Sequence, residues 1–274
     1  MTVNRAKWSL AALAVGLLVA VSIAAPMAAR AAEPTGTFAM ISDIHFDPLD
    51  PTELARRLAD TAPEDWDEIF ASIDSQTASP YGKDSNYALF KSAMQAFSRA
   101  AADVDFVVVP GDFLAHRIEE RAADALGMDR NAAAITALTE KTTIFVANTL
   151  RAALPGKHMI LALGNNDSAC GDYKIQPDGQ YLAKTAEAIR DTLGDDALDP
   201  DFDQTYGAGG YYAVQHPTVK NASVIVLNDT LWSAKYDDDC ADGTPTNEAA
   251  DMLAWLERRL ENARTDGESV WLVR

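Results

Sequence analysis

Residues 37–47 read Thr-Phe-Ala-Met-Ile-Ser-Asp-Ile-His-Phe-Asp, a short apolar run that leads into Asp43 and His45. An apolar run of this length predicts a strand that is covered on both faces of a sheet. The Asp-x-His triplet after it offers a carboxylate and an imidazole, and both groups are good metal ligands. In an extended chain, residues two apart point the same way, so we expect both side chains to reach one ion.

Two further strand-like runs end in the same kind of residue. Residues 104–110 are followed by Gly111-Asp112, and residues 159–163 are followed by Gly164-Asn165-Asn166-Asp167. Each motif alone is common, but here three strand ends in succession present oxygen or imidazole ligands. Ligands of open α/β sheets collect at the carboxyl ends of strands, so we expect these side chains to form one site.

The rest of the chain alternates strand and helix patterns, which predicts an α/β domain around a mixed or parallel sheet. The polar stretch 47–85 interrupts the alternation, and we expect an irregular excursion over the sheet edge that serves as a lid or cap. No repeat or interdomain linker is visible, so one domain is expected. Further strands are predicted over residues 223–227 and 269–273, and helices over 86–102, 131–154, 180–193 and 247–263.

Charge narrows the range of partners. The chain carries 41 acidic against 23 basic residues, a formal net charge of −18. A surface this acidic repels nucleic-acid phosphates, so the composition excludes a nucleic-acid-binding protein. An anionic substrate then requires metal ions that locally invert the field.

The N-terminus has the features of a secretory signal peptide over residues 1–31. Arg5 and Lys7 precede an apolar stretch over residues 9–25, and Ala29-Arg30-Ala31 gives a small-x-small cleavage pattern. The alternative is an uncleaved membrane anchor, since the apolar stretch is at the short limit for spanning. With cleavage, the expected protein is secreted or periplasmic and has no stable membrane span.

The only two cysteines, Cys170 and Cys240, both lie in the exported part. An oxidising compartment favours one disulfide between them, and two free thiols are the alternative.

The order of the motifs resembles the calcineurin-like metallophosphoesterases. Residues 42–47, Gly111-Asp112 and residues 163–167 carry the resemblance, which extends over residues 36–274. The acid sphingomyelinase-like phosphodiesterases are the most similar branch, because His116 stands four residues after Asp112. The resemblance implies a metallophosphoesterase-like four-layer α/β sandwich.

The resemblance also implies a role for each motif residue. Asp43 and His45 would bind a first divalent ion, Asp112 would bridge two ions, and Asn165 would bind the second. His116 would lie near the leaving-group oxygen, as a general acid or a phosphate-binding group. The ligand set suits zinc best, with manganese or iron as alternatives. The implied activity is hydrolysis of a small phosphate ester, a lipid head group or a nucleotide-like diester, by water that the dinuclear centre activates.

Two departures from the family pattern matter. Asn166 stands where the family usually has a histidine that contacts the scissile phosphate. The Asn166 amide would keep the phosphate contact, but it cannot act as an imidazolium acid, so the general-acid task would shift to His116. The family also supplies three later histidine ligands, whereas this chain has four histidines in all: His45, His116, His158 and His216. We therefore expect a domain that is incomplete at its C-terminus. The alternatives to an active phosphoesterase are a non-catalytic exported module, an inactive fragment, or a protein that binds a single ion.

Overall fold

The computed structural model describes residues 36–73, 77–194, 197–237, 240 and 247–274. The signal peptide predicted over residues 1–31 lies outside the described residues. Among the described helices, none combines the length and the hydropathy that crossing a bilayer requires.

The first sheet contains three parallel strands in the order β1-β2-β3. They are β1 (Phe38–Met40), β2 (Phe106–Val109) and β3 (His158–Leu161), with Phe38, Phe106 and His158 in register. All four residues of the central β2 are buried, as a continuous apolar run requires. The three strands run in one direction, so the loops that follow them meet at one edge of the sheet.

The second sheet contains β4 (Tyr212–Gln215), β5 (Ala222–Val226) and β6 (Ser269–Val273). β4 pairs antiparallel with β5, and β5 pairs parallel with β6. The two sheets contact each other through large side chains. The Tyr212 hydroxyl donates to the carbonyl oxygen of Leu161 at 2.7 Å, and the Phe106 and Trp271 rings meet edge to face.

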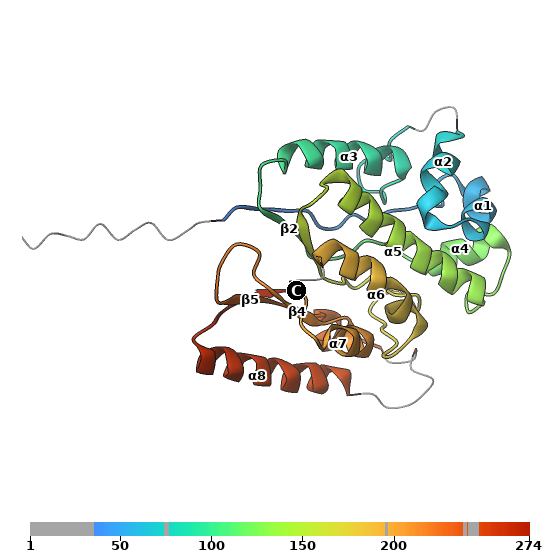
Figure 1. The fold of residues 1–274 in the computed structure, drawn as a ribbon. Helices are drawn as coiled ribbons and strands as arrows, with labels where there is room; N and C mark the ends of the chain where they lie inside the picture. Colours follow the sequence, from blue (N-terminus) through green and yellow to red (C-terminus); the bar gives the residue numbers. More distant parts are fainter. Residues whose placement is uncertain (1–35, 74–76, 195–196, 238–239, 241–246) are drawn as a thin grey trace, which may run out of the picture. The chain divides into compact units, whose positions relative to one another are not determined.

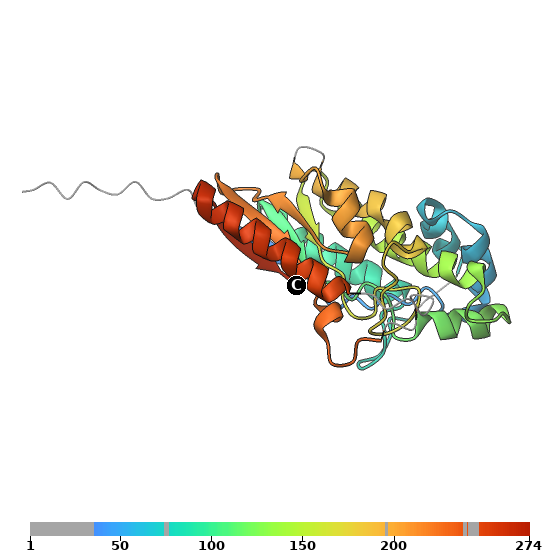
Figure 2. The ribbon, with the colours of Figure 1, turned by 90° about the horizontal axis from the view of Figure 1, so that it is seen from below.

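Helices cover the two sheets. α6 packs on β3, α5 packs on α3 and α6, α7 packs on β4, and α8 packs on β6. Figure 1 shows α8 beyond β4 and β5, on the side away from α3 and α5, and Figure 2 shows the strands between these groups of helices. The bounds are α3 (Tyr87–Ala100), α5 (Ala133–Ala153), α6 (Gln180–Leu193), α7 (Phe202–Gly209) and α8 (Glu248–Asp266).

These elements confirm the predicted mixed α/β architecture with parallel strands. Each predicted strand and helix is present, and its ends differ from the prediction by a few residues, because frayed ends carry little signal in the sequence.

The prediction for residues 47–85 was wrong in one respect. This stretch contains two short helices, α1 (Ala55–Asp60) and α2 (Trp66–Ala71), where an irregular excursion was expected. The Trp66 side chain is fully buried, and its indole N–H donates to the carbonyl oxygen of Leu58 at 3.2 Å. Helices of fewer than two turns show no measurable periodicity, so burial of a few apolar side chains determines them instead. α4 (Ile118–Leu126) was not predicted either.

The cysteines form the predicted disulfide. Cys170, in the segment after β3, is bonded to Cys240, in the segment after β5, with their Cα atoms 5.9 Å apart. The bond therefore ties together two loops that are distant in the sequence.

Candidate metal centre

The loops after β1 and β2 run side by side and continue the pairing of the two strands. The backbone N–H of Asp43 donates to the carbonyl oxygen of Gly111 at 3.2 Å, and that of His45 donates to the carbonyl oxygen of Asp112 at 2.9 Å. The next residue, Phe46, donates to Phe113 at 2.8 Å. This ladder brings the first two motifs together.

The convergence depends on left-handed backbone. Asp43, His45 and Asp112 have φ angles of 54°, 42° and 57°. The side chains do approach one another. The extended conformation expected for Asp43 and His45 is nevertheless wrong, because both residues have left-handed φ angles. Such conformations cost about 1–3 kcal/mol each and persist where the surroundings over-determine them.

Asp167 supplies much of that surrounding structure. Its fully buried carboxylate accepts backbone N–H groups of Asp112 and Phe113 at 2.8 Å each, of Leu114 at 3.1 Å and of Gly164 at 2.8 Å. Burial, together with the negative charge of Asp112, raises the pKa of Asp167 to about 7, while its backbone hydrogen bonds act in the opposite direction. A cation nearby favours the charged form, so a bound metal ion would lower this pKa.

Two glycines let the second and third loops touch. Gly111 has a φ angle of 102°, and a Cβ atom there would lie 2.3 Å from the backbone nitrogen of Gly164. A Cβ atom on Gly164 would lie 2.3 Å from Oδ1 of Asp112. The close approach therefore requires glycine at both positions.

The three side chains of the first two motifs present their ligand atoms to one another. His45 Nε2 lies 3.6 Å from Oδ2 of Asp112 and 4.0 Å from Oδ1 of Asp43, and the three ligand atoms lie within 4.8 Å of one another. His45 Nδ1 is 3.1 Å from the carbonyl oxygen of Leu114, which can only accept, so Nδ1 carries the proton and Nε2 offers its lone pair. Such a partner behind a histidine is typical of metal ligands. This donor set fits a divalent transition-metal ion.

The two asparagines of the third motif have different surroundings. The amide nitrogen of Asn165 donates to Oδ1 of Asp172 at 2.6 Å, which leaves the amide oxygen of Asn165 for another partner. The backbone N–H and the amide nitrogen of Asn166 both approach Oδ1 of Asp112, at 3.1 and 3.2 Å. Asn166 is only 5% exposed, so its amide lies against Asp112.

His116 lies against the first motif. Its ring stacks on that of His45 with a centroid separation of 4.3 Å, and its Nδ1 is 2.7 Å from Oδ1 of Asp84. The sequence analysis did not identify Asp84 as a site residue. The ligand atoms of His45, Asp84 and His116 form a second close group.

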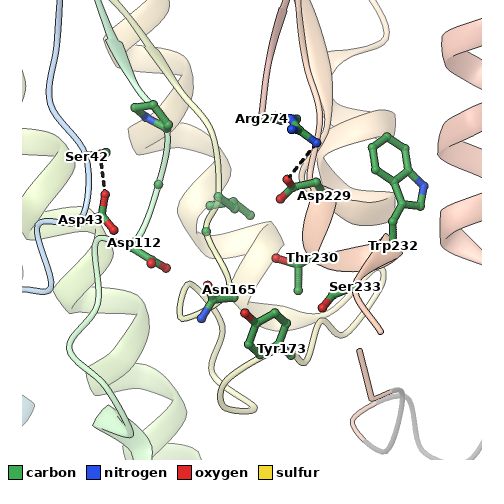
Figure 3. A pocket seen from close by; sticks show the side chains of 14 residues that line it. Ser42, Asp43, Asp112, Asn165, Tyr173, Asp229, Thr230, Trp232, Ser233 and Arg274 are labelled. Atoms are coloured by element: carbon green, nitrogen blue, oxygen red, sulfur yellow. Dashed lines mark hydrogen bonds and ion pairs between the residues drawn. The ribbon is translucent and has the colours of Figure 1, made fainter. Parts of the chain in front are cut away.

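A cavity of about 500 Å³ opens beside the metal-ligand candidates. Figure 3 shows Asp43 and Asp112 on one side of it, and Asp229 and Trp232 on the other. Asp229 forms an ion pair with Arg274 at 3.8 Å. The sequence analysis assigned neither Asp229 nor Arg274 to this site. The lining residues that carry polar or aromatic side chains are Ser42, Asp43, Asp112, Asn165, Tyr173, Asp229, Thr230, Trp232, Ser233 and Arg274.

The other two histidines lie elsewhere. His158 begins β3, at the end opposite to the site, and its Nδ1 contacts the carbonyl oxygen of Leu193. His216 follows β4, and its ring packs against Phe106 and Trp271. Neither residue lines the cavity.

Comparison with known proteins agrees with this arrangement. The profile of the calcineurin-like phosphoesterase family matches residues 36–271. The chain is similar to acid sphingomyelinase-like phosphodiesterase 3b of Mus musculus, with 26% identity over 252 residues, which cover 87% of this chain and 47% of that protein. The protein of the same name in Homo sapiens is 26% identical over 258 residues, 88% of this chain and 48% of that protein. The chain therefore spans about half the length of the curated relatives it matches. It belongs to the calcineurin-like phosphoesterase family.

Proposed function

We propose that this chain is the metal-dependent catalytic domain of an exported phosphodiesterase of the acid sphingomyelinase-like type. One observation carries the proposal: Asp43, Asp112 and Asn165 come from three successive strand ends and line one cavity, and His45 Nε2 lies 3.6 Å from the Asp112 carboxylate and 4.0 Å from that of Asp43. Carboxylate, imidazole and amide oxygen groups gathered at one cavity form a set that binds divalent ions and leaves room for a substrate.

In this proposal the site would hold two divalent ions, with zinc the preferred metal and manganese or iron the alternatives. Asp43 and His45 would hold the first ion, Asn165 would hold the second through its amide oxygen, and Asp112 would contribute to both. The two oxygens of Asp112 suit that shared role, because Oδ2 faces His45 and Oδ1 faces the loop of Asn165 and Asn166. When bound, the ions lower the pKa of a water molecule and neutralise charge on the phosphate.

His116 and Asn166 complete the proposed chemistry. We assign His116 as the general acid that protonates the leaving group, since it stacks directly on His45. We assign Asn166 to hold Asp112 in place, because both of its N–H donors point to that carboxylate. Contact between Asn166 and the phosphate would require its amide to turn away from Asp112.

The finer points of fold, substrate and location belong to the same proposal. Two sheets in contact, with helices on their outer sides, are compatible with the four-layer sandwich of the family. The curated relatives are phosphodiesterases by name, which favours a diester with a lipid head group or a nucleotide-like group. The disulfide supports a secreted or periplasmic location, because such bonds persist in oxidising compartments.

A second candidate is a non-catalytic exported module. Among the described residues that line the cavity, Asn165 and Asp112 are the only ones assigned to the second ion. A site with so few ligands binds its ion weakly, which favours single-ion binding or an empty site.

Metal content and turnover decide between the two candidates. The purified chain would be analysed for zinc, manganese and iron, and assayed with bis(4-nitrophenyl) phosphate. The proposal expects two ions per chain, and turnover that Asp112→Ala abolishes. The control is Asp191→Ala, which removes an exposed ion pair with Arg151 and should retain turnover. One ion or none, with no turnover in the unmodified chain, would support the non-catalytic module.

A further inference from the structure

We infer that Asp84 is a positioning residue that holds the His116 ring by its Nδ1 and so presents Nε2 to the substrate. This inference rests on the proposed function, in which His116 protonates the leaving group. It starts from the 2.7 Å contact between Oδ1 of Asp84 and Nδ1 of His116. A carboxylate can only accept, so the ring donates through Nδ1.

The backbone delivers Asp84 to the site. After the two short helices α1 and α2, the chain returns to the first motif and pairs with it. The backbone N–H of Ser85 donates to the carbonyl oxygen of His45 at 2.8 Å, and the N–H of Asp47 donates to that of Ser85 at 2.9 Å. The end of the segment 47–85 is therefore paired with the loop that carries His45, and Asp84 lies next to the paired residue Ser85.

The second oxygen of Asp84 has its own partner. Arg121 of α4 contacts Oδ2 of Asp84 through Nη1 at 3.4 Å, and through Nη2 it pairs with Asp47. Asp47 is only 4% exposed and also accepts the backbone N–H of Leu49 at 3.0 Å. With a separate partner for each oxygen, the Asp84 carboxylate is held in one orientation, and Oδ1 is directed to His116.

The His116 ring needs such support because its surroundings leave it open. The side chain is 60% exposed, and it borders a second cavity of about 560 Å³ that Asp84 and Arg121 also line. Stacking on His45 fixes the plane of the ring, within 17° of parallel, but not its rotation within that plane. The bond to Asp84 removes the remaining freedom. A general acid is efficient only in a fixed geometry, so this bond contributes to rate.

A purely structural reading assigns Asp84 to the ion network with Arg121 and Asp47 alone. The two readings differ in what happens to the His116 ring when the Asp84 carboxylate is removed altogether, as in Asp84→Ala. In the structural reading the stability falls and the ring is unaffected. In ours the ring loses its acceptor and rotates.

The first test is nitrogen NMR of the metal-free protein with ¹⁵N-labelled histidine. The chain has four histidines, and His116→Gln identifies the signal of interest. We expect a hydrogen-bonded Nδ1–H signal for His116 that disappears in Asp84→Ala, which removes the acceptor, and that returns at least in part in Asp84→Glu. The matched control is Asp67→Ala, which removes a carboxylate paired with Lys91 at a distance from the site. An unchanged His116 signal in folded Asp84→Ala would overturn the inference.

The second test uses leaving-group dependence. Asp84→Ala should lower turnover of a phenyl phosphodiester by about 10–100-fold, because a poor leaving group needs a positioned acid. Turnover of the nitrophenyl ester, which leaves without protonation, should change little, and His116→Gln should show the same pattern. An equal loss on both esters would contradict a positioning role. If the unmodified chain hydrolyses neither ester, the proposed function fails, while the NMR result still decides whether Asp84 orients the ring.

Discussion

Asp112 and Asp167 hold each other's loops. Asp167 accepts the backbone N–H of Asp112 at 2.8 Å, while Asp112 accepts the backbone N–H of Asn166, the residue before Asp167, at 3.1 Å. Each carboxylate thus fixes the backbone that carries the other. The loops after β2 and β3 are therefore one unit, and a change in either is transmitted to the metal-ligand side chains.

Asp167→Asn should destabilise the whole fold and weaken metal binding. The amide nitrogen cannot accept, so at least one of the four backbone N–H groups that point to Asp167 is left without a partner. An unsatisfied buried donor costs about 1–3 kcal/mol. Urea denaturation would measure the loss, with Asp191→Asn as an exposed control. Equal midpoints for the two variants would contradict the anchoring role of Asp167.

Gly164→Ala should displace Asp112 and reduce the affinity for metal. The added methyl group would lie 2.3 Å from Oδ1 of Asp112, closer than any real contact, so the carboxylate must move. Gly207→Ala is the matched control, because its Cβ atom meets nothing closer than 3.7 Å and α7 gains a better helix former. Zinc titration by calorimetry should show weaker binding in Gly164→Ala only. Retention of full affinity would mean that the loop accommodates the methyl group.

Reduction of the disulfide should loosen the cavity walls. Cys170 and Cys240 close a loop of 70 residues that includes Tyr173 and Trp232, which line the cavity. Loss of such a crosslink costs about 2–4 kcal/mol of stability. Thermal unfolding with and without reductant would measure this loss of stability. The double variant Cys170→Ser with Cys240→Ser should melt at the temperature of the reduced protein, and its melting temperature should not depend on reductant. A melting temperature that does not respond to reductant would contradict this prediction.

His216 should make the fold sensitive to acid. Its Nδ1 accepts the backbone N–H groups of Thr218 and Val219 at 3.2 and 3.1 Å, and burial lowers its pKa below the ordinary value of 6.5. Between that lowered pKa and 6.5 the unfolded chain binds more protons than the folded one, so stability falls as the pH falls. The loss is at most about 1.4 kcal/mol for each unit of pKa depression.

Chemical denaturation at pH 7.5 and pH 5.5 would test this. His216→Asn keeps an acceptor near Nδ1 but cannot titrate, so it should lose less stability between the two pH values than the unmodified chain. The comparison of the two proteins removes the contribution of other titrating groups, such as Asp47. An identical pH dependence in both proteins would exclude His216 as the sensor.

The regular part of the fold was predictable because its signals are local. Within the run 104–110, residues 106–109 are apolar throughout and form the fully buried β2; the stretch 180–193 has helical periodicity, and it forms α6. The short helices α1 and α2 were not predictable, since each has six residues and owes its position to tertiary packing, as the buried Trp66 shows. Sequence periodicity carries no information about contacts of that kind.

The candidate site was predictable only in its residue types. The motifs named Asp43, His45 and Asp112, and these residues do converge. The left-handed backbone at Asp112 could not be inferred, because its N–H group donates to the buried Asp167, which is 55 residues away in the chain. Asp84 was missed for a similar reason: it is 32 residues from His116 in the chain, and only the backbone pairing of Ser85 brings it back.

The carboxylate of Asp167 has a consequence for how this protein can change over evolutionary time. The main chain of the site is held by the buried Asp167 and, in return, by Asp112, so the other proposed metal ligands carry less of that task. A lineage can exchange one of those other ligands and keep its fold, provided that Asp167, Asp112 and the glycines beside them persist. Divergence in this protein should therefore appear first at those other ligands, as a change in which ion or ester is accepted, and last at the residues that hold the main chain.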